Sequence, residues 1–228
     1  MARKLRCTPT WQLDDATLAP LLAAMHLGRR QVFRRGDFLY RQGEVTPQFY
    51  LILRGQVLIA STREDGCEFT LELMGHRTLC GEAAAFDGKP SFTSAQALED
   101  TEVMAFPVAT VWAALGEHPS LAVALLRITA SKQRIIAVRA QYLAGLKPEA
   151  RIAELLLRLT EQHGTPASEG VSISLHLTHQ QIASLTGTSR VTVTRVFKRL
   201  REQGVIVADG QRLRIPELPR LMAAGIHR

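Results

Sequence analysis

The stretch from Leu177 to Gly204 places the tightest limits on the fold, because it predicts two short helices joined by a sharp turn. Thr178 can cap the first helix, and Gln181, three residues later, can complete a capping box. Gly187 supplies the left-handed backbone that ends this helix, and Ser189 is a good N-cap for the second helix.

The second predicted helix has two chemically different faces. Its apolar face has the spacing i, i+3, i+4 and i+7 and consists of Val193, Val196, Phe197 and Leu200. Its polar side carries Arg190, Thr194, Arg195, Lys198 and Arg201. The first helix offers Ile182, Ala183 and Leu185 as its apolar side. A glycine turn followed by a basic helix is typical of a helix-turn-helix, whose second helix enters the DNA major groove. An ordinary helical hairpin with a solvated basic face is the alternative.

The segments on either side of these helices predict short strands. Residues 171–177 alternate strictly between apolar and polar and predict a strand that leads into the first helix. Asp209-Gly210 predicts a two-residue hairpin turn, flanked by strands at 205–207 and 213–215. A β-hairpin directly after a recognition helix is a wing, so we expect a winged helix-turn-helix.

Charge is distributed in a way that favours nucleic acid as a partner. The chain has 228 residues, room for two modest domains, and a formal net charge of +7. From Lys147 onward Lys and Arg outnumber Asp and Glu by five, against two in the preceding residues. The basic excess therefore accompanies the predicted helix-turn-helix, as neutralisation of DNA phosphates requires.

No apolar run reaches the roughly 18 residues of a membrane span, and no signal-peptide core follows the basic residues 1–6. We therefore expect a cytoplasmic protein that does not contact the membrane. Cys7, Cys67 and Cys80 form no CxxC pair, which favours reduced thiols over disulfides or a zinc site. A redox role for Cys7 stays open.

The N-terminal half predicts an antiparallel β-structure. Residues 14–26 predict a short amphipathic helix. From Leu27 to about Pro107, short apolar stretches alternate with glycine-bearing turns, and a turn spacing of roughly 8 to 12 residues is typical of a β-sandwich or jelly roll. The apolar stretches lie at 31–33, 38–40, 49–53, 56–60 and 69–73.

Residues 118–146 predict one long helix with a heptad seam. The seam runs through Leu121, Leu125, Ile128, Lys132, Ile135, Arg139, Tyr142 and Leu146. We expect its apolar members, Leu121, Leu125, Ile128, Ile135, Tyr142 and Leu146, to form a parallel dimer interface. The alternative is that the seam packs on the chain's own β-domain.

Lys147-Pro148 breaks this helix and marks a domain boundary. Beyond it we expect a helix at 149–163, a loop at 164–170, and a short helix or frayed tail at 216–228. The predicted fold class is α+β, with a β-roll at 1–117, a dimerisation helix at 118–146 and the winged helix-turn-helix at 147–228.

This order of elements resembles the CRP/FNR family of bacterial transcription regulators over about residues 27–215. In the β-roll the resemblance rests on Gly36, Gly43, Tyr50, Gly55, Val57 and the run 75–86, and in the DNA-binding part on 177–187 and 189–195. It implies a cyclic-nucleotide-binding-like jelly roll as an N-terminal effector-sensing domain. It further implies a homodimer that binds double-stranded, palindromic DNA, with RNA polymerase as a further partner.

The resemblance also assigns DNA contacts. The residues implied to approach base edges are Arg190, Val191, Thr194 and Arg195. Those implied to contact phosphates are Thr178, His179, Gln180, Ser189, Thr192 and Lys198. Many family members carry a glutamate where Val191 stands, so we expect a thymine methyl contact in place of a cytosine contact. The run 190–195 is similar to that of NtcA-type nitrogen regulators, which implies a half-site near GTA and a palindrome such as GTA-N8-TAC.

The implied effector pocket consists of Gly81, Glu82, Ala83, Ser91, Phe92, Thr93 and Ile136. cAMP-responsive members pair the cyclic phosphate with an arginine, but the matching stretch here, 89–93, contains none. Lys89 lacks the bidentate geometry of arginine. We therefore expect an effector other than cAMP, or none, and no certain cofactor. An iron–sulfur cluster of the oxygen-sensing type needs four cysteines, and a haem would need His26 or His76 as its axial ligand.

The sequence is less compatible with two other classes of function than with DNA-binding regulation. A small-molecule sensor that acts through a protein partner is the alternative function. An enzyme is not expected, because the one cluster resembling an active site, Glu82 with Cys80 and His76, has no base–nucleophile–orienter set.

Overall fold

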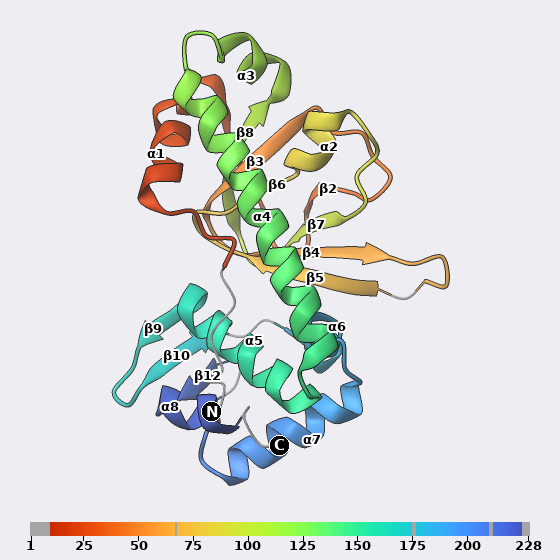
Figure 1. The fold of residues 1–228 in the computed structure, drawn as a ribbon, viewed down its shortest axis with the longest axis vertical. Helices are drawn as coiled ribbons and strands as arrows, with labels where there is room; N and C mark the ends of the chain where they lie inside the picture. The colour runs from red at the N-terminus through yellow and green to blue at the C-terminus, as the bar shows by residue number, and fades with distance from the viewer. Residues whose placement is uncertain (1–9, 67, 175–176, 210–211, 225–228) are drawn as a thin grey trace. The chain divides into compact units, whose positions relative to one another are not determined.

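The computed structural model describes residues 10–66, 68–174, 177–209 and 212–224 (Figure 1). The chain divides into two compact units, one spanning Trp11–Arg134 and the other containing the residues from Ile135 onward. The division falls inside a long helix, α4 (Pro119–Gly145). Within the described part of the chain, no helix is long and apolar enough to cross a membrane.

The N-terminal unit is an antiparallel β-roll with helices on one side. Its elements are α1 (Asp15–Ala23), a 3-10 helix η1 (Met25–Leu27), β1 (Arg29–Phe33), β2 (Phe38–Tyr40), β3 (Gln48–Arg54), β4 (Val57–Thr62), β5 (Glu68–Met74), β6 (Leu79–Cys80), α2 (Glu82–Asp87), β7 (Ser94–Ala97), β8 (Thr101–Pro107), α3 (Val108–Ala114) and the first part of α4. The five strands predicted from the sequence are confirmed, whereas β6, β7, β8 and α3 were not predicted.

The strands form two four-stranded sheets, with the orders β1-β8-β3-β6 and β2-β7-β4-β5. One core cluster draws on both sheets and includes Tyr40, Tyr50, Ile59 and Val103. A second cluster lies between the other face of the first sheet and the helices α1, α3 and α4. The first sheet is therefore buried on both faces, by the second sheet on one side and by the helices on the other.

The edges of these sheets are short, irregular or charged. β1 forms one edge of the first sheet, where Arg29 and Arg30 are exposed and Val32 is 69% exposed. β6, at the other edge, has two residues. β2 and β5 form the two edges of the second sheet; β2 changes register between Phe38 and Tyr40, and the pairing of β5 with β4 changes register between Ile59 and Ala60.

The heptad seam of the long helix does not form the predicted dimer interface along its first half. Leu121, Leu125 and Ile128 lie in the second core cluster with Phe49 and Phe106, and each is at most 4% exposed. These side chains pack on the β-roll of their own chain, which is the alternative to a dimer interface. A periodic apolar stripe shows that one face of a helix is buried, but not which surface buries it.

Farther along the same seam, Ile135 is also buried, at 1% exposed, while Tyr142 and Leu146 are partly buried.

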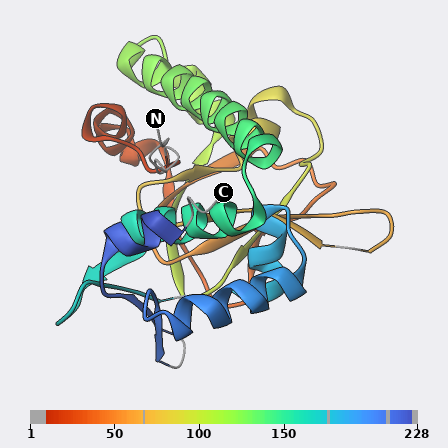
Figure 2. The ribbon, with the colours of Figure 1, turned by 60° about the horizontal axis from the view of Figure 1, so that its bottom comes forward.

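The C-terminal unit combines helices with a small sheet (Figure 2). After the end of α4 come α5 (Pro148–His163), β9 (Gly164–Pro166), β10 (Val171–Ser174), α6 (His179–Thr186), α7 (Arg190–Glu202), β11 (Val207–Asp209), β12 (Arg212–Ile215) and α8 (Leu218–Ala224). The sheet order is β11-β12-β10-β9. The winged helix-turn-helix order is thus confirmed, and Leu218–Ala224 form a helix within the predicted C-terminal segment, whose residues 225–228 lie outside the described part of the chain.

Three local predictions in this unit need correction. The predicted loop at 164–170 contains β9, which forms because it can pair with β10, a partner that local sequence signals do not reveal. The strand predicted at 205–207 starts only at Val207, since the N–H groups of Val205 and Ile206 donate to the carbonyl of Leu200 and close the end of α7. Asp209 belongs to β11 and pairs with Arg212, so it is not a turn residue. Residues 210 and 211 lie outside the described part of the chain.

Candidate nucleic-acid interface

The first helix of the motif begins and ends as its sequence predicts. The Thr178 hydroxyl accepts the N–H of Gln181 at 3.2 Å, and the Gln181 side chain accepts the N–H of Thr178 at 2.8 Å. This capping box satisfies two N–H groups that have no partner within α6. Gly187 has φ +57° and ends the helix. The turn therefore rests on a residue that adopts left-handed backbone at little cost.

The second helix, α7, is oriented by its apolar side. Ser189 caps it by accepting the N–H of Thr192 at 3.1 Å. The predicted apolar face is confirmed as buried, with Val193, Val196, Phe197 and Leu200 each at most 4% exposed. In the first helix, Ile182 and Ala183 are buried as predicted, while Leu185 is only partly buried.

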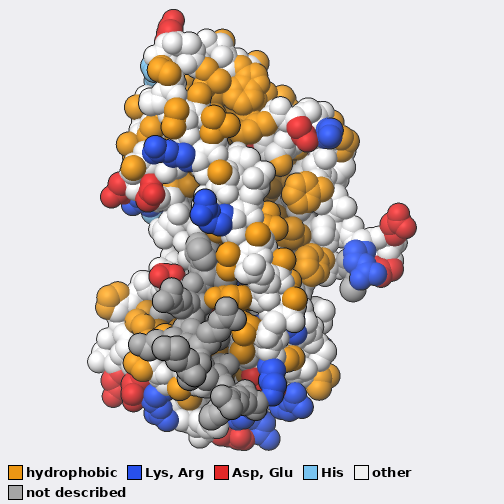
Figure 3. All heavy atoms as spheres, viewed as in Figure 1, with side chains coloured by type: hydrophobic (Ala, Val, Ile, Leu, Met, Phe, Trp, Pro, Cys, Tyr) orange, Lys and Arg blue, Asp and Glu red, His pale blue; other side chains and the backbone are white. Residues whose placement is uncertain are grey.

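Burial of this face leaves the opposite side of α7 open to solvent. Arg190, Thr194 and Arg195 are exposed, and Val191 is 78% exposed. In Figure 3, Lys and Arg side chains gather over α7. The four side chains predicted to approach base edges thus share one exposed, basic surface. An isolated apolar side chain on it, Val191, can offer only a methyl contact to a partner.

The residues predicted to contact phosphate surround this surface. Thr178, Gln180, Ser189 and Lys198 are exposed, and Thr192 is partly buried. They come from the N-terminal ends of α6 and α7 and from the middle of α7.

His179 joins the two helices. Its Nδ1 lies 3.0 Å from the hydroxyl of Thr194, and its ring packs on Phe197 with centroids 5.2 Å apart. Burial lowers the pKa of His179 below its ordinary value, and the positive charges of Arg201 and Arg190 lower it further. The neutral imidazole can therefore hold Thr194 in place while it packs between α6 and α7.

Two further residues near this surface were not predicted from the sequence. Glu149, in the first turn of α5, lies 3.6 Å from the Arg195 guanidinium. Arg195 is 72% exposed, and exposed ion pairs of this kind contribute about 0–1 kcal/mol. Arg151 donates to two backbone carbonyls of other helices. Both partnerships depend on tertiary contacts, so no local pattern in the sequence could have revealed them.

The residues predicted to form the effector pocket differ in how far they are buried. Gly81, with φ +81°, begins α2, and its missing Cβ leaves room for the Tyr40 ring. Ser91 and Thr93 are buried, and the Ser91 hydroxyl donates to the Thr93 carbonyl at 2.9 Å. In contrast, Ala83 is exposed and Phe92 is 64% exposed. Ile136 is exposed as well and belongs to the C-terminal unit.

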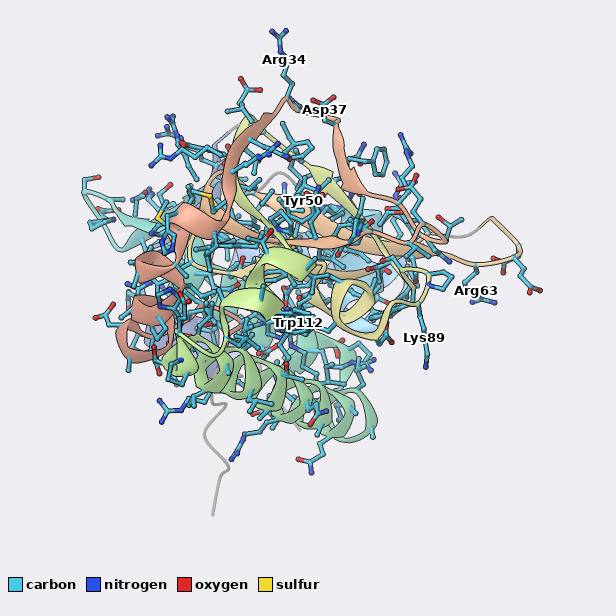
Figure 4. All side chains as sticks on the ribbon, turned by 90° about the horizontal axis from the view of Figure 1, so that it is seen from above. Arg34, Asp37, Tyr50, Arg63, Lys89 and Trp112 are labelled. Carbon is cyan, nitrogen blue, oxygen red and sulfur yellow. The ribbon has the colours of Figure 1, made fainter. Side chains whose placement is uncertain are left out.

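Glu82 is engaged by a cation of its own chain. Lys132 of α4 donates to the Glu82 carboxylate at 2.6 Å and to the Leu79 carbonyl at 2.7 Å, and its ammonium lies 4.9 Å from the centroid of the Trp11 ring. Lys89, which follows α2 in the chain, is exposed and extends away from the β-roll (Figure 4). The carboxylate therefore already has a positive partner that the sequence did not predict.

Cys80, His76 and His26 are each held by burial or by contacts within the N-terminal unit. Burial raises the pKa of the Cys80 thiol to about 12, against the opposing effect of Lys132, so the residue is a neutral thiol. His76 Nδ1 lies 2.7 Å from the Leu53 carbonyl, and His26 stacks edge-on with His118. No group of three or more His, Cys, Asp or Glu side chains is placed to hold a metal ion in the described ranges.

Comparisons with known proteins agree with this architecture. A family model described as "Crp-like helix-turn-helix domain" matches residues 150–224, and one described as "Cyclic nucleotide-binding domain" matches residues 30–118. The "Global nitrogen regulator" of Nostoc sp. is 31% identical over 199 residues, covering 85% of this chain and 89% of that protein. The "CRP-like cAMP-activated global transcriptional regulator" of Mycobacterium tuberculosis is 28% identical, covering 83% and 84%.

Solved structures show the same fold. FixK2 from Bradyrhizobium japonicum superposes with a TM-score of 0.77 at 19% identity, covering 88% of this chain and 98% of that chain. A transcriptional regulator of the CRP family from Thermus thermophilus superposes with a TM-score of 0.70 at 25% identity, covering 86% and 98%.

Proposed function

This chain belongs to the CRP/FNR family of transcription regulators, and from that premise we propose that it acts as a homodimer that reads a palindromic DNA site. The observation that carries the proposal is the exposed surface of α7, where two arginines, a threonine and a valine stand opposite a fully buried face. In this proposal residues 1–117 sense an effector, 118–146 carry the dimer contact and 147–228 bind DNA.

The base contacts are assigned to four residues of α7. Arg190 and Arg195 each offer a planar pair of donors that suits the O6 and N7 atoms of guanine. Val191 would contact a thymine methyl, and Thr194 would lie beside it. Glu149 does not compete strongly for Arg195, because the pair is exposed and 3.6 Å long. A half-site near GTA is consistent with these side chains.

The phosphate contacts would fix the register of α7 in the groove without specifying sequence. Thr178, Gln180, Ser189, Thr192 and Lys198 are assigned to this role. His179 is assigned to it as well, and its contact with Thr194 supports an additional part in holding a base-contacting residue.

The dimer contact is assigned to the exposed side of α4. Leu126 is 71% exposed, and Ala130, Ala137, Ala140 and Ala144 are exposed on the same side of the helix. This side lies opposite Leu121, Leu125 and Ile128, and its spacing by three, four or seven residues suits two parallel helices. Small side chains allow two backbones to approach closely. Two recognition helices related by a two-fold axis would then meet half-sites about one helical turn apart.

The effector is proposed to be something other than cAMP, or to be absent. An incoming cyclic phosphate would need a cation, whereas Lys132 is already bound to Glu82 and Lys89 points away from the fold. RNA polymerase is the expected protein partner at the promoter.

DNA reading is tested by fluorescence anisotropy on ligand-stripped protein. The labelled duplexes are GTA-N8-TAC and a scrambled version, each with and without cAMP. We expect tight binding to the palindrome alone and no effect of cAMP. Binding that requires cAMP would overturn the effector part of the proposal. If no duplex is enriched even from a random pool, the DNA-reading assignment is wrong.

The dimer contact is tested by sedimentation of L126D, with V32D as a matched control. Both substitutions place a carboxylate at an exposed apolar position, one on α4 and one on β1. We expect L126D to be monomeric and V32D to stay dimeric. A dimeric L126D would remove this face from the interface.

A further inference from the structure

Arg151 links two helix ends to a third helix. It lies in the first turn of α5, where its Nη1 donates to the carbonyl of Leu143 at 2.9 Å and its Nη2 donates to the carbonyl of Gly187 at 3.1 Å. Leu143 belongs to the last turn of α4, and Gly187 is the C-cap of α6. All three residues are in the C-terminal unit.

Both acceptors are groups that need an external donor. The last four carbonyls of a helix have no partner within the helix, and they carry the negative end of the helix dipole. A guanidinium is planar and can donate to two acceptors at once, while a lysine ammonium lacks this fork. Arg151 therefore neutralises the ends of α4 and α6 with one side chain.

A second contact joins the same two elements. A Cβ added to Gly187 would lie 3.0 Å from the Leu143 Cδ2 atom and 3.5 Å from Arg151 Nη1. The last turn of α4 thus packs directly against the turn between α6 and α7, by an apolar side chain as well as through Arg151.

We propose that Arg151 is a positioning residue that fixes the turn of the helix-turn-helix to the last turn of α4. The inference rests on the proposed DNA-reading function. The helix α4 is continuous from the N-terminal unit into the C-terminal one. A displacement of its last turn would therefore be passed to α7 through Arg151, in addition to the covalent connection at Leu146 and Lys147. Arg151 contacts no DNA in this role; it sets the geometry in which Arg190 and Arg195 meet bases.

The test compares R151M and R151K with the wild-type full-length chain. R34M serves as a control that removes one exposed arginine from the N-terminal unit. Affinities for the palindromic and scrambled duplexes are measured over a range of salt concentrations. For R151M we expect specific affinity to fall by about 5–150-fold, the usual range of coupling between sites. Affinity for the scrambled duplex and the salt dependence should stay as in the wild type. R151K should recover only part of the loss, and R34M should show no loss of specificity.

Amide hydrogen exchange supplies a readout that does not depend on DNA. In R151M the amides of 184–190 and of 143–147 should exchange faster, while those of α8 should not change. A folded R151M or R151K with wild-type exchange in both segments would overturn the proposal. So would an equal loss of affinity on both duplexes with a smaller salt slope, since that pattern marks a phosphate contact. If the wild type itself fails to distinguish the duplexes, the proposed function fails, and the exchange result still decides the role of Arg151.

Discussion

Replacing Lys132 by methionine should destabilise the N-terminal unit more than any loss of a surface ion pair. The Lys132 and Glu82 side chains are 11% and 13% exposed, so solvent screens them little. The variant removes two charge-assisted hydrogen bonds, each worth about 1.5–3 kcal/mol, and leaves the Glu82 carboxylate without its cation. Breaking a buried pair by removing one partner costs about 3–5 kcal/mol. Because methionine preserves the packing of the lysine stem, we expect the free energy of unfolding to fall by about that amount.

The measurement is urea unfolding followed by tryptophan fluorescence and circular dichroism. Trp11 and Trp112 both belong to the N-terminal unit, so the fluorescence reports its unfolding. The control is R30M, which breaks the exposed Arg30–Glu102 pair and should cost about 0–1 kcal/mol. The double variant K132M/E82Q should be more stable to urea than K132M but less stable than the wild type, because it no longer buries an unpaired charge. A K132M variant as stable as R30M would show that the pair is solvated, contrary to the reasoning above.

Three further predictions concern single side chains. R190A should weaken specific DNA binding by about 1–3 kcal/mol and relax the preference at one base pair. Competition with singly substituted duplexes measures this preference. An equal loss of affinity for every duplex would contradict the base contact. Because burial raises the pKa of Cys80 to about 12, iodoacetamide at pH 8 should modify Cys80 in urea but not in the native protein, as mass spectrometry of its peptide would show. Burial and two arginines lower the pKa of His179 from 6.5, so the unfolded chain binds more protons there. The stability from neutral His179 is therefore complete above pH 6.5 and is lost as the pH falls toward the folded-state pKa. Urea midpoints of H179Q should depend less on pH between 7 and 5 than those of the wild type, and equal slopes would refute this.

The helix-turn-helix could be predicted well because its signals are local. The capping box of Thr178 and Gln181 and the left-handed Gly187 act within a few residues of themselves, and the structure contains both as predicted. The buried face of α7 follows from spacing alone. A segment whose conformation is decided by its nearest neighbours can be predicted without knowing the rest of the chain.

Features that depend on distant partners could not be predicted. Lys132 stands in the heptad seam, but its partner Glu82 is 50 residues away in the chain. Arg151 reaches a carbonyl 36 residues away, and β9 exists because β10 pairs with it. For Leu121, Leu125 and Ile128 the pattern indicated a buried face correctly, yet the surface that buries them is the chain's own β-roll. The DNA and effector contacts remain predictions, since they concern molecules beyond this chain.

The sheet edges of the β-roll bear on how this protein behaves when concentrated. An open strand edge presents unpaired N–H and C=O groups and can recruit a strand from another molecule, which leads to aggregation. Here β1 carries Arg29 and Arg30 beside its exposed Val32, and β6 is too short to template a strand. The edges β2 and β5 are each interrupted by a register shift. The β-roll of a regulator proposed to act as a dimer therefore has side chains and irregularities that discourage association through its strand edges, in keeping with a dimer contact made by α4.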